Sequence, residues 1–166
     1  RRAVGFRSEA GLQSPPSLDA LKRFLPADEL WPLRPVHEYH RLMSQTERYT
    51  NEYGRPAGLE DWIRKLQLAH AIALQFNVET CRAKKYATSG VLPWQWNEPW
   101  PGICWSLVDW YGGPKPAAYY CQRAFAPVRI TADFEKYKWS AGETWAADVI
   151  VVNDRAEALE RLKASA

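Results

Sequence analysis

Apolar residues recur with helical spacing in one long stretch of the chain. Between Leu59 and Ala83 the apolar positions step by four, three, four and three residues, at Trp62, Leu66, Ala69, Ala73 and Phe76. This spacing places them on one buried stripe of an α-helix. Acidic residues lie in the first turn of the stretch and basic residues near its end, as the helix dipole favours. We therefore predict a helix over residues 59–83.

Shorter apolar runs on either side of this helix predict strands. Residues 3–8 have the composition of a short buried strand, with Glu9 at its carboxyl end and Gly11 after it. Residues 90–95 form a second run of this kind. The order of strand, helix, strand and helix predicts a mixed α/β fold with parallel strands in βαβ units.

Proline, glycine and capping residues mark the other boundaries. Ser17 is a typical N-cap for a short helix that ends at Pro26. Residues 26–58 are predicted to be loop-like, with one helical turn within residues 36–45. A further helix is predicted over residues 116–125, begun by prolines and ended by Pro127.

The pattern changes after Pro127. Residues 128–139 and 144–154 are predicted to be two strands joined by a turn at residues 140–142, with Trp145, Ala147, Val149 and Val151 on one face. Strands that follow βα units indicate a second domain of β-sandwich type. Since two βα units are only a quarter of a barrel of ~250 residues, we expect a fragment with a domain boundary between residues 1–127 and 128–166.

Composition narrows the classes of function. Nine tryptophans among 166 residues exceed what a core of this size needs, because a large indole is seldom fully buried. Some of these rings are therefore expected to line a surface that binds a flat ligand. A net charge of +3 without a run of Lys or Arg predicts no nucleic-acid partner. No apolar stretch reaches the ~18 residues of a membrane helix, so we expect no membrane partner.

Two motif-rich stretches resemble a known family. One carries Ser8-Glu9-x-Gly11, followed by Gln13-Ser14. The other carries, in order, Gly90, Trp94-Gln95-Trp96-Asn97-Glu98, Trp100-Pro101, Trp105-Ser106, Asp109-Trp110 and Pro114-Lys115. These motifs resemble the seventh and eighth strands of the catalytic barrel in glycoside hydrolase family 2, closest to the branch of β-mannosidases and exo-β-glucosaminidases.

The resemblance extends over nearly the whole chain. "QLAHAIALQFNVETCRAKK" is similar to the helix between those two strands, and "VRITADFEKYKWSAGETWAADVIVVND" to the first strands of the immunoglobulin-like domain that follows the barrel. It implies a partial (β/α)8 barrel, its last two βα units, and then the beginning of an immunoglobulin-like β-sandwich.

The family's chemistry implies a role for Glu9. Two glutamates act by the retaining route, with their carboxyl groups ~5–5.5 Å apart. The Glu of the Ser-Glu-x-Gly motif is the nucleophile, which corresponds to Glu9. No segment matches the strand that carries the acid/base, so we expect the chain alone to be inactive and its intact parent to cleave terminal β-mannosides or β-glucosaminides.

Substrate-binding positions are implied at the end of the eighth strand. Trp94 is expected to stack on the sugar, with core packing as the alternative; Trp96 is a second choice for this role. Gln95, Asn97 and Glu98 are expected to contact the substrate or, alternatively, to form a satisfied polar network. Glu98 departs from the family pattern, which has Asp at this position, and it is not expected to be the proton donor.

Metals and cofactors are not expected. His37 and His40 lack the spacing of a helical zinc motif, and loop packing or a contribution to the sugar site remain open for them. The three cysteines are odd in number and lack metal-ligand spacing, which predicts reduced core thiols, with an extracellular disulfide as the alternative. The expected partner is an oligosaccharide or glycoside, and open strand edges predict self-association of the fragment. A non-catalytic carbohydrate-binding or interaction module is the alternative to a glycosidase.

Overall fold

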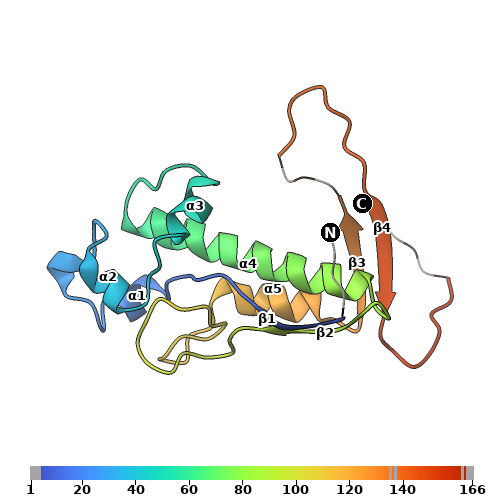
Figure 1. Cartoon of the computed structure of the whole chain (residues 1–166), viewed down its shortest axis with the longest axis horizontal. Coiled ribbons are helices and arrows are strands. Elements are labelled where there is room, and N and C mark those ends of the chain that lie inside the picture. Colours follow the sequence, from blue (N-terminus) through green and yellow to red (C-terminus); the bar gives the residue numbers. More distant parts are fainter. Residues whose placement is uncertain (1–4, 135, 137, 162, 164–166) are drawn as a thin grey trace.

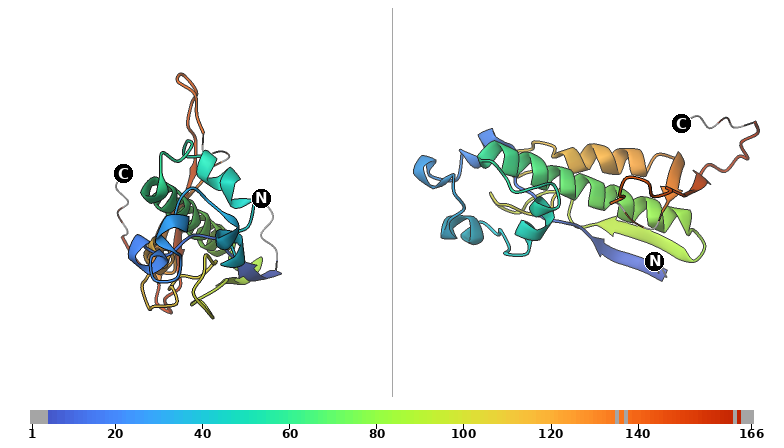
Figure 2. Two further views of the ribbon diagram at one scale, coloured as in Figure 1. Left: turned by 90° about the vertical axis from the view of Figure 1, so that its left-hand side faces the viewer. Right: turned by 90° about the horizontal axis from the view of Figure 1, so that it is seen from above.

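One long helix organises the molecule. The computed structural model describes residues 5–134, 136, 138–161 and 163. Helix α4 (Leu59–Ala83), which has the bounds predicted from its spacing, lies beside α5 (Pro116–Ala124) and over the strand pair β1 (Gly5–Ala10) and β2 (Thr88–Pro93) (Figure 1). The view from above shows α4 and α5 side by side (Figure 2). The predicted mixed α/β arrangement is confirmed, and the described residues form no closed barrel.

The two strands pair in parallel, as the alternating order predicted. Arg7 pairs with Val91 and Ala10 with Pro93. Each strand differs by two residues from its predicted range, and residues 3 and 4 of the first prediction lie outside the described part. Glu9 is consequently the penultimate residue of β1, and Trp94 is the first residue after β2.

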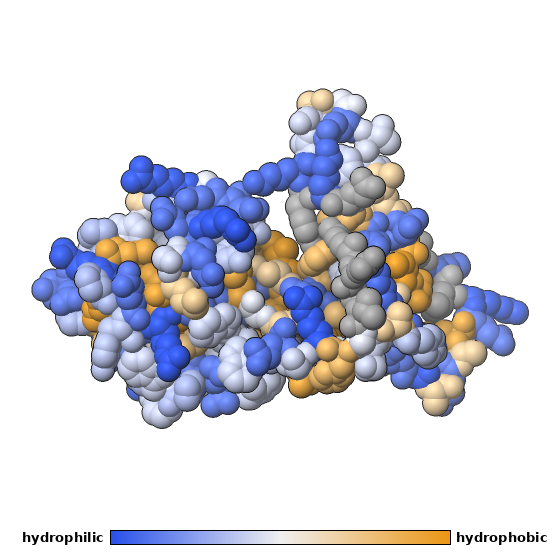
Figure 3. Space-filling view, viewed as in Figure 1, coloured by the Kyte–Doolittle hydropathy of each residue, from blue (hydrophilic) through white to orange (hydrophobic). Residues whose placement is uncertain are grey.

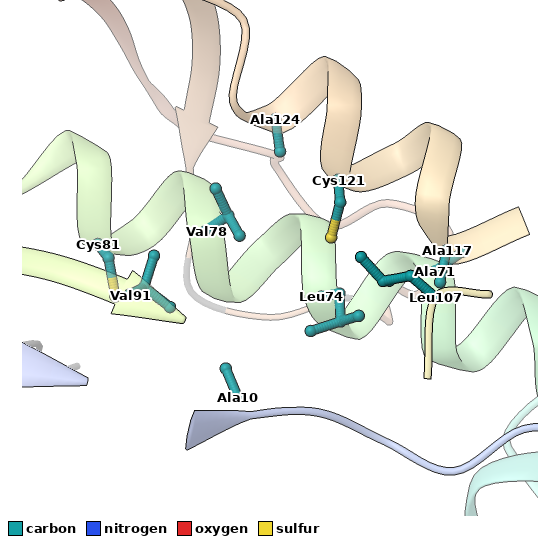
Figure 4. Close-up of a cluster of buried hydrophobic side chains, with 10 residues drawn as sticks. All are labelled: Ala10, Ala71, Leu74, Val78, Cys81, Val91, Leu107, Ala117, Cys121 and Ala124. Carbon is teal, nitrogen blue, oxygen red and sulfur yellow. The ribbon is translucent and has the colours of Figure 1, made fainter. Parts of the chain in front are cut away.

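The main core lies between α4, α5 and the strand pair. It contains ten buried residues: Ala10, Ala71, Leu74, Val78, Cys81, Val91, Leu107, Ala117, Cys121 and Ala124 (Figure 4). The predicted stripe is correct for Trp62, Leu66 and Ala69, but Ala73 and Phe76 are only half-buried. The buried face of α4 therefore differs from the predicted stripe. A single stripe assumes that one surface packs against the helix, whereas several elements pack around α4.

Short helices gather at the amino-terminal end of α4. They are α1 (Leu18–Leu21), the 3-10 helix η1 (Ala27–Glu29), α2 (Pro35–Tyr39) and α3 (Thr46–Asn51). Ser17 caps α1 by accepting a bond from Ala20 N, as predicted. Residues 26–58 contain more helix than the single turn we predicted. The reason is tertiary packing, since such short segments depend on apolar contacts, here a second core that includes Leu42, Trp62 and Ile103.

Strands β3 (Val128–Asp133) and β4 (Asp148–Asn153) form an antiparallel pair. Both are shorter than predicted, so that Trp145 and Ala147 lie outside β4, and Val149 and Val151 are exposed while Val152 is buried. The pair is anchored to α4 because Glu79 accepts from Arg129 Nε at 2.8 Å and from Thr131 Oγ1 at 2.9 Å. The division between residues 127 and 128 stays a prediction.

Leu74 is central to the main core and provides a test of it. Leu74→Ala is expected to lower the free energy of unfolding by about 2–5 kcal/mol, because it leaves a cavity at a fully buried position. Urea denaturation followed by circular dichroism measures this difference. Tyr86→Ala is the control at a highly exposed position and is expected to change stability by less than about 0.5 kcal/mol. Equal effects of the two changes would contradict the described core.

Candidate active site at the strand ends

Glu9 and Trp94 lie at the same edge of the parallel pair. Glu9 is exposed, directly before the buried Ala10. Trp94 follows β2, and its backbone N–H donates to Ala10 O at 2.8 Å. The carboxyl ends of parallel strands are where catalytic groups of α/β barrels are found. The fold therefore brings the predicted nucleophile and the predicted stacking residue to neighbouring strand ends.

The segment after β2 exposes aromatic and amide side chains. Trp94 is 47% exposed and Trp96 69% exposed; Asn97 is exposed and Gln95 half-buried. The segment folds back on itself, since Gln95 N donates to Trp105 O at 3.2 Å and Leu107 N to Gln95 O at 2.9 Å. The two indoles have different surroundings, because Trp96 lines an apolar cavity of about 680 Å³ beside α5 and Trp94 is not among its lining residues.

Gly11 permits the close approach of the two strand ends. A Cβ atom at this position would lie 2.3 Å from Trp94 O and 3.3 Å from Trp105 Cδ1. The first distance is far below any ordinary contact, and the obstructing atom belongs to the backbone. Glycine is therefore required here by space, the usual reason for glycine where two backbones meet closely.

A buried ion pair lies beneath the exposed segment. Lys115 Nζ is 2.7 Å from Glu98 Oε1, and both side chains are 1% exposed. The same ammonium donates to Ser14 O at 2.8 Å and Cys104 O at 3.1 Å, and Ser106 Oγ donates to Glu98 Oε1 at 2.7 Å. Burial lowers the pKa of Lys115, and the Glu98 carboxylate opposes this shift by favouring the charged form.

Glu98 therefore lies differently from the other predicted substrate-binding residues. Its carboxylate faces Lys115 and Ser106 rather than solvent, which is the arrangement of the satisfied polar network that we considered as the alternative. Sequence reasoning missed Lys115 as a buried group because a lysine in a Pro- and Gly-rich stretch gives no periodic signal. Two local signals marked the position without revealing its burial: Pro116 makes Lys115 the residue before a helix, and Lys115 belongs to the Pro114-Lys115 motif of the family resemblance.

The polar network continues into α4. Ser14 Oγ and His70 Nδ1 are 2.9 Å apart, and both side chains are fully buried. Burial lowers the pKa of His70 to about 3, and the positive charge of Lys115 acts in the same direction. Gln13, three residues after β1, joins two other segments: its Nε2 donates to Ile103 O in the segment after β2 at 3.1 Å, and its Oε1 accepts from Met43 N between α2 and α3 at 3.0 Å.

Asp109, His40 and His37 make contacts that hold neighbouring loops and turns. Asp109 Oδ1 accepts from Tyr111 N at 2.9 Å and Gly113 N at 2.8 Å, so this carboxylate stabilises the turn. His40 Nδ1 lies 2.8 Å from Pro101 O, and its ring stacks on Trp100 at 5.1 Å. His37 is buried against the backbone of Arg34.

The cysteines, possible metal ligands and long helices were each predicted from the sequence to have no special role. The three cysteines are free and buried, as predicted. Within the described residues no group of three His, Cys, Asp or Glu side chains is placed to hold a metal ion. No helix in the same part of the chain is long and apolar enough to cross a membrane.

Curated proteins include relatives that match most of the chain. The exo-β-D-glucosaminidase of Streptomyces avermitilis is 31% identical over 179 residues, which cover 98% of this chain and 19% of the relative. The β-mannosidase B of Aspergillus niger is 31% identical over 144 residues, which cover 81% of this chain and 17% of the relative. No protein-family model matches the chain.

Solved structures agree with these relatives. The β-D-mannosidase of Dictyoglomus thermophilum superposes with a TM-score of 0.79 at 30% identity, covering 92% of this chain and 18% of that structure. An exo-chitosanase of Amycolatopsis orientalis in complex with PNP-β-D-glucosamine superposes with a TM-score of 0.61 at 30% identity, covering 72% of this chain and 16% of that structure. The chain is thus homologous over most of its length to β-mannosidases and exo-β-D-glucosaminidases of glycoside hydrolase family 2 and spans less than a fifth of theirs.

Gly11→Ala tests the close contact of the strand ends. It is expected to destabilise the fold by about 1–3 kcal/mol, since the added methyl group must displace the Trp94 carbonyl or strain the backbone. Thermal unfolding followed by tryptophan fluorescence measures the change. Gly58→Ala is the control, because its backbone is extended and its added Cβ meets no atom within 4 Å. Similar losses at both positions would contradict the contact.

The low pKa of His70 predicts a pH dependence of stability. The folded chain keeps this imidazole neutral down to a pH of about 3, whereas an unfolded histidine binds a proton near pH ~6.5. Stability is therefore expected to fall as the pH drops from 7 towards 3, by up to ~1.4 kcal/mol per pH unit from this group. Urea denaturation of wild type and His70→Gln at several pH values measures the free energy of unfolding. The variant is expected to lose less stability on acidification than wild type. Equal losses would exclude a contribution of His70 to the pH dependence.

Proposed function

We propose that this chain is the part of a retaining exo-β-glycosidase that supplies the nucleophile and the stacking residue of the sugar site. In this proposal residues 1–127 are the last two βα units of a (β/α)8 barrel, and residues 128–166 begin an immunoglobulin-like domain. The observation that carries the proposal is the exposed Glu9 at the carboxyl end of β1, beside exposed Trp94 after β2. The homology described above supports the reaction class.

The proposed reaction is a double displacement on a terminal β-mannoside or β-glucosaminide. The Glu9 carboxylate attacks the anomeric carbon and forms a glycosyl-enzyme ester, while an acid/base group protonates the departing oxygen. Water, activated by the same acid/base group, then releases the sugar with retained configuration. Glu9 suits this role because carboxylates act as nucleophiles in glycosidases, and because its side chain is exposed at a strand end.

The side chains around Glu9 support recognition of a sugar. Trp94 offers a half-exposed indole face, suited to the apolar face of a pyranose, and Trp96 offers a second ring beside α5. Gln95 and Asn97 can donate to and accept from hydroxyl groups. Glu98 is buried and paired with Lys115, so its carboxylate does not face solvent as Gln95 and Asn97 do in part.

The chain alone is proposed to be inactive because its acid/base is absent. General acid–base assistance typically contributes ~10²–10⁴-fold to the rate, and no residue beside Glu9 takes this role in the proposal.

Apolar side chains reach the surface in several patches (Figure 3), and Phe6 and Leu92 on the two strands are more than half exposed. These exposed side chains are consistent with the predicted self-association, which stays untested.

Glu9→Gln in the longer enzyme tests the proposal. The amide is a poor nucleophile, so turnover of nitrophenyl β-mannoside and nitrophenyl β-glucosaminide is expected to fall by at least ~10³-fold, while circular dichroism stays unchanged. Added azide is expected to restore turnover and give a product of inverted configuration. Glu60→Gln, an exposed glutamate in the first turn of α4, is the matched control and should keep wild-type turnover.

The Glu9→Gln experiment also distinguishes a glycosidase from the alternative, a non-catalytic carbohydrate-binding module. Exposed tryptophans such as Trp94 and Trp110 would equally suit a non-catalytic carbohydrate-binding module. In that case Glu9→Gln would leave any turnover of the longer protein unchanged, and the isolated chain would bind the glycosides in calorimetry through Trp94. Retained turnover in Glu9→Gln would therefore rule out the nucleophile assignment.

A further inference from the structure

Lys115 joins segments that are far apart in the chain. It is the residue before α5, and its buried ammonium has three acceptors: the Glu98 carboxylate, Ser14 O and Cys104 O. An ammonium has three N–H donors, so each donor can be satisfied. Ser14 belongs to the segment after β1, whereas Glu98 and Cys104 belong to the segment after β2. One side chain thus holds both segments to the start of α5.

The joined segments carry the proposed site. Ser14 is five residues from Glu9, and Glu98 is four residues from Trp94. Further bonds connect the same segments directly, from Trp94 N to Ala10 O at 2.8 Å and from Ser14 N to Cys104 O at 3.1 Å. A shift of Lys115 would therefore be transmitted to both strand ends.

Stability alone does not account for charged groups at this place. A buried ion pair can often be replaced by apolar side chains of similar volume without loss of stability, because desolvation offsets most of the attraction. What apolar side chains cannot replace is the set of directed bonds from one ammonium to three acceptors. The ion pair contributes a defined geometry.

We propose that Lys115 and Glu98 are positioning residues, which hold the ends of β1 and β2 in the relative placement that presents Glu9 and Trp94 to one sugar. The proposal rests on the function proposed above. Neither residue touches the substrate; both act through the backbone segments that they join.

The length of the Glu98 side chain is part of this arrangement. Its Oε1 accepts from both Lys115 Nζ and Ser106 Oγ at 2.7 Å within a closed environment. Glu98→Asp withdraws the carboxylate by one methylene, although Asp is the residue of the family's motif. We expect the loss of these contacts to reduce kcat, and wild-type kcat in Glu98→Asp would show that the pair does not position the site.

The first experiment uses the chain itself and does not depend on activity. Lys115→Met with Glu98→Gln removes both charges and keeps the approximate volumes, so the fold is expected to persist. Amide hydrogen exchange of Trp94 and Ser14 is expected to accelerate by about tenfold or more, because their bonds to Ala10 O and Cys104 O connect the chain around β1 with the segment after β2, which Lys115 no longer holds together. Exchange at Val78 in α4 is expected to stay within about twofold. Unchanged exchange at Trp94 and Ser14, or equal acceleration at Val78, would overturn the proposal.

The second experiment measures turnover in the longer enzyme. The double variant is expected to lower kcat by about 10²-fold, the effect of a misplacement of ~1 Å at a reacting group, with an unfolding midpoint close to wild type. Arg129→Met is the matched control, since it breaks an ion pair of the same 2.7 Å length with Glu79, away from the strand ends. Unchanged kcat in the double variant, or a loss matched by Arg129→Met, would overturn the proposal.

The two proposals can fail separately. Retained turnover in Glu9→Gln refutes the catalytic assignment and with it the positioning of a nucleophile, while exchange at Trp94 and Ser14 still decides whether the ion pair holds the strand ends. Loss of turnover in Glu9→Gln together with unchanged kcat in the double variant refutes only the positioning role.

Discussion

The close contact between the ends of β1 and β2 is the constraint on which the candidate site depends. Trp94 N donates to Ala10 O, and the Trp94 carbonyl lies where a side chain at Gly11 would start. A side chain at position 11 could not be accommodated by a rotamer change, because the obstructing atom, the Trp94 carbonyl oxygen, belongs to the backbone. The contact therefore determines which residues stand together at the exposed edge, namely Glu9 from one strand and Trp94 from the other.

The layers around the strand pair make this contact possible. Helix α4 and helix α5 cover one side of the pair with a core of small and aliphatic residues, so the strands are held from one direction. The opposite side carries exposed groups such as Phe6 and Glu9. A parallel pair open on one side is unusual, since parallel sheets are normally covered on both faces. If the chain is part of a (β/α)8 barrel, as proposed, the other strands of that barrel enclose this open face.

Polar groups beneath the candidate site are as deeply buried as the apolar core. Lys115, Glu98, Ser106, Ser14 and His70 are all buried, and hydrogen bonds or an ion pair connect them to each other or to the backbone. Such networks rigidify a fold where their hydrogen bonds are satisfied, and in this one the buried Nε2 of His70 is left without a hydrogen-bond partner among the described residues. The exposed side of the strand ends thus lies above a buried polar network.

The sequence by itself determined the elements with strong local signals. The spacing of apolar residues in α4, the N-cap at Ser17 and the prolines around α5 are local features, and the structure has helices at each of these places. The motifs around Glu9 and Trp94 likewise pointed to the family, because residue types and their order are sequence properties. Alternation of strands and helices was sufficient for the parallel pairing.

Only the tertiary structure decided how these elements contact one another. The short helices of residues 26–58 depend on apolar contacts with α4, and the shift of the buried face of α4 follows from the several elements packed around it. The pairing of Glu98 with Lys115 joins residues 17 positions apart through a closed loop, which no periodic pattern encodes. Burial and pairing depend on three-dimensional proximity, so only the fold shows that the Glu98 carboxylate is buried and paired with Lys115.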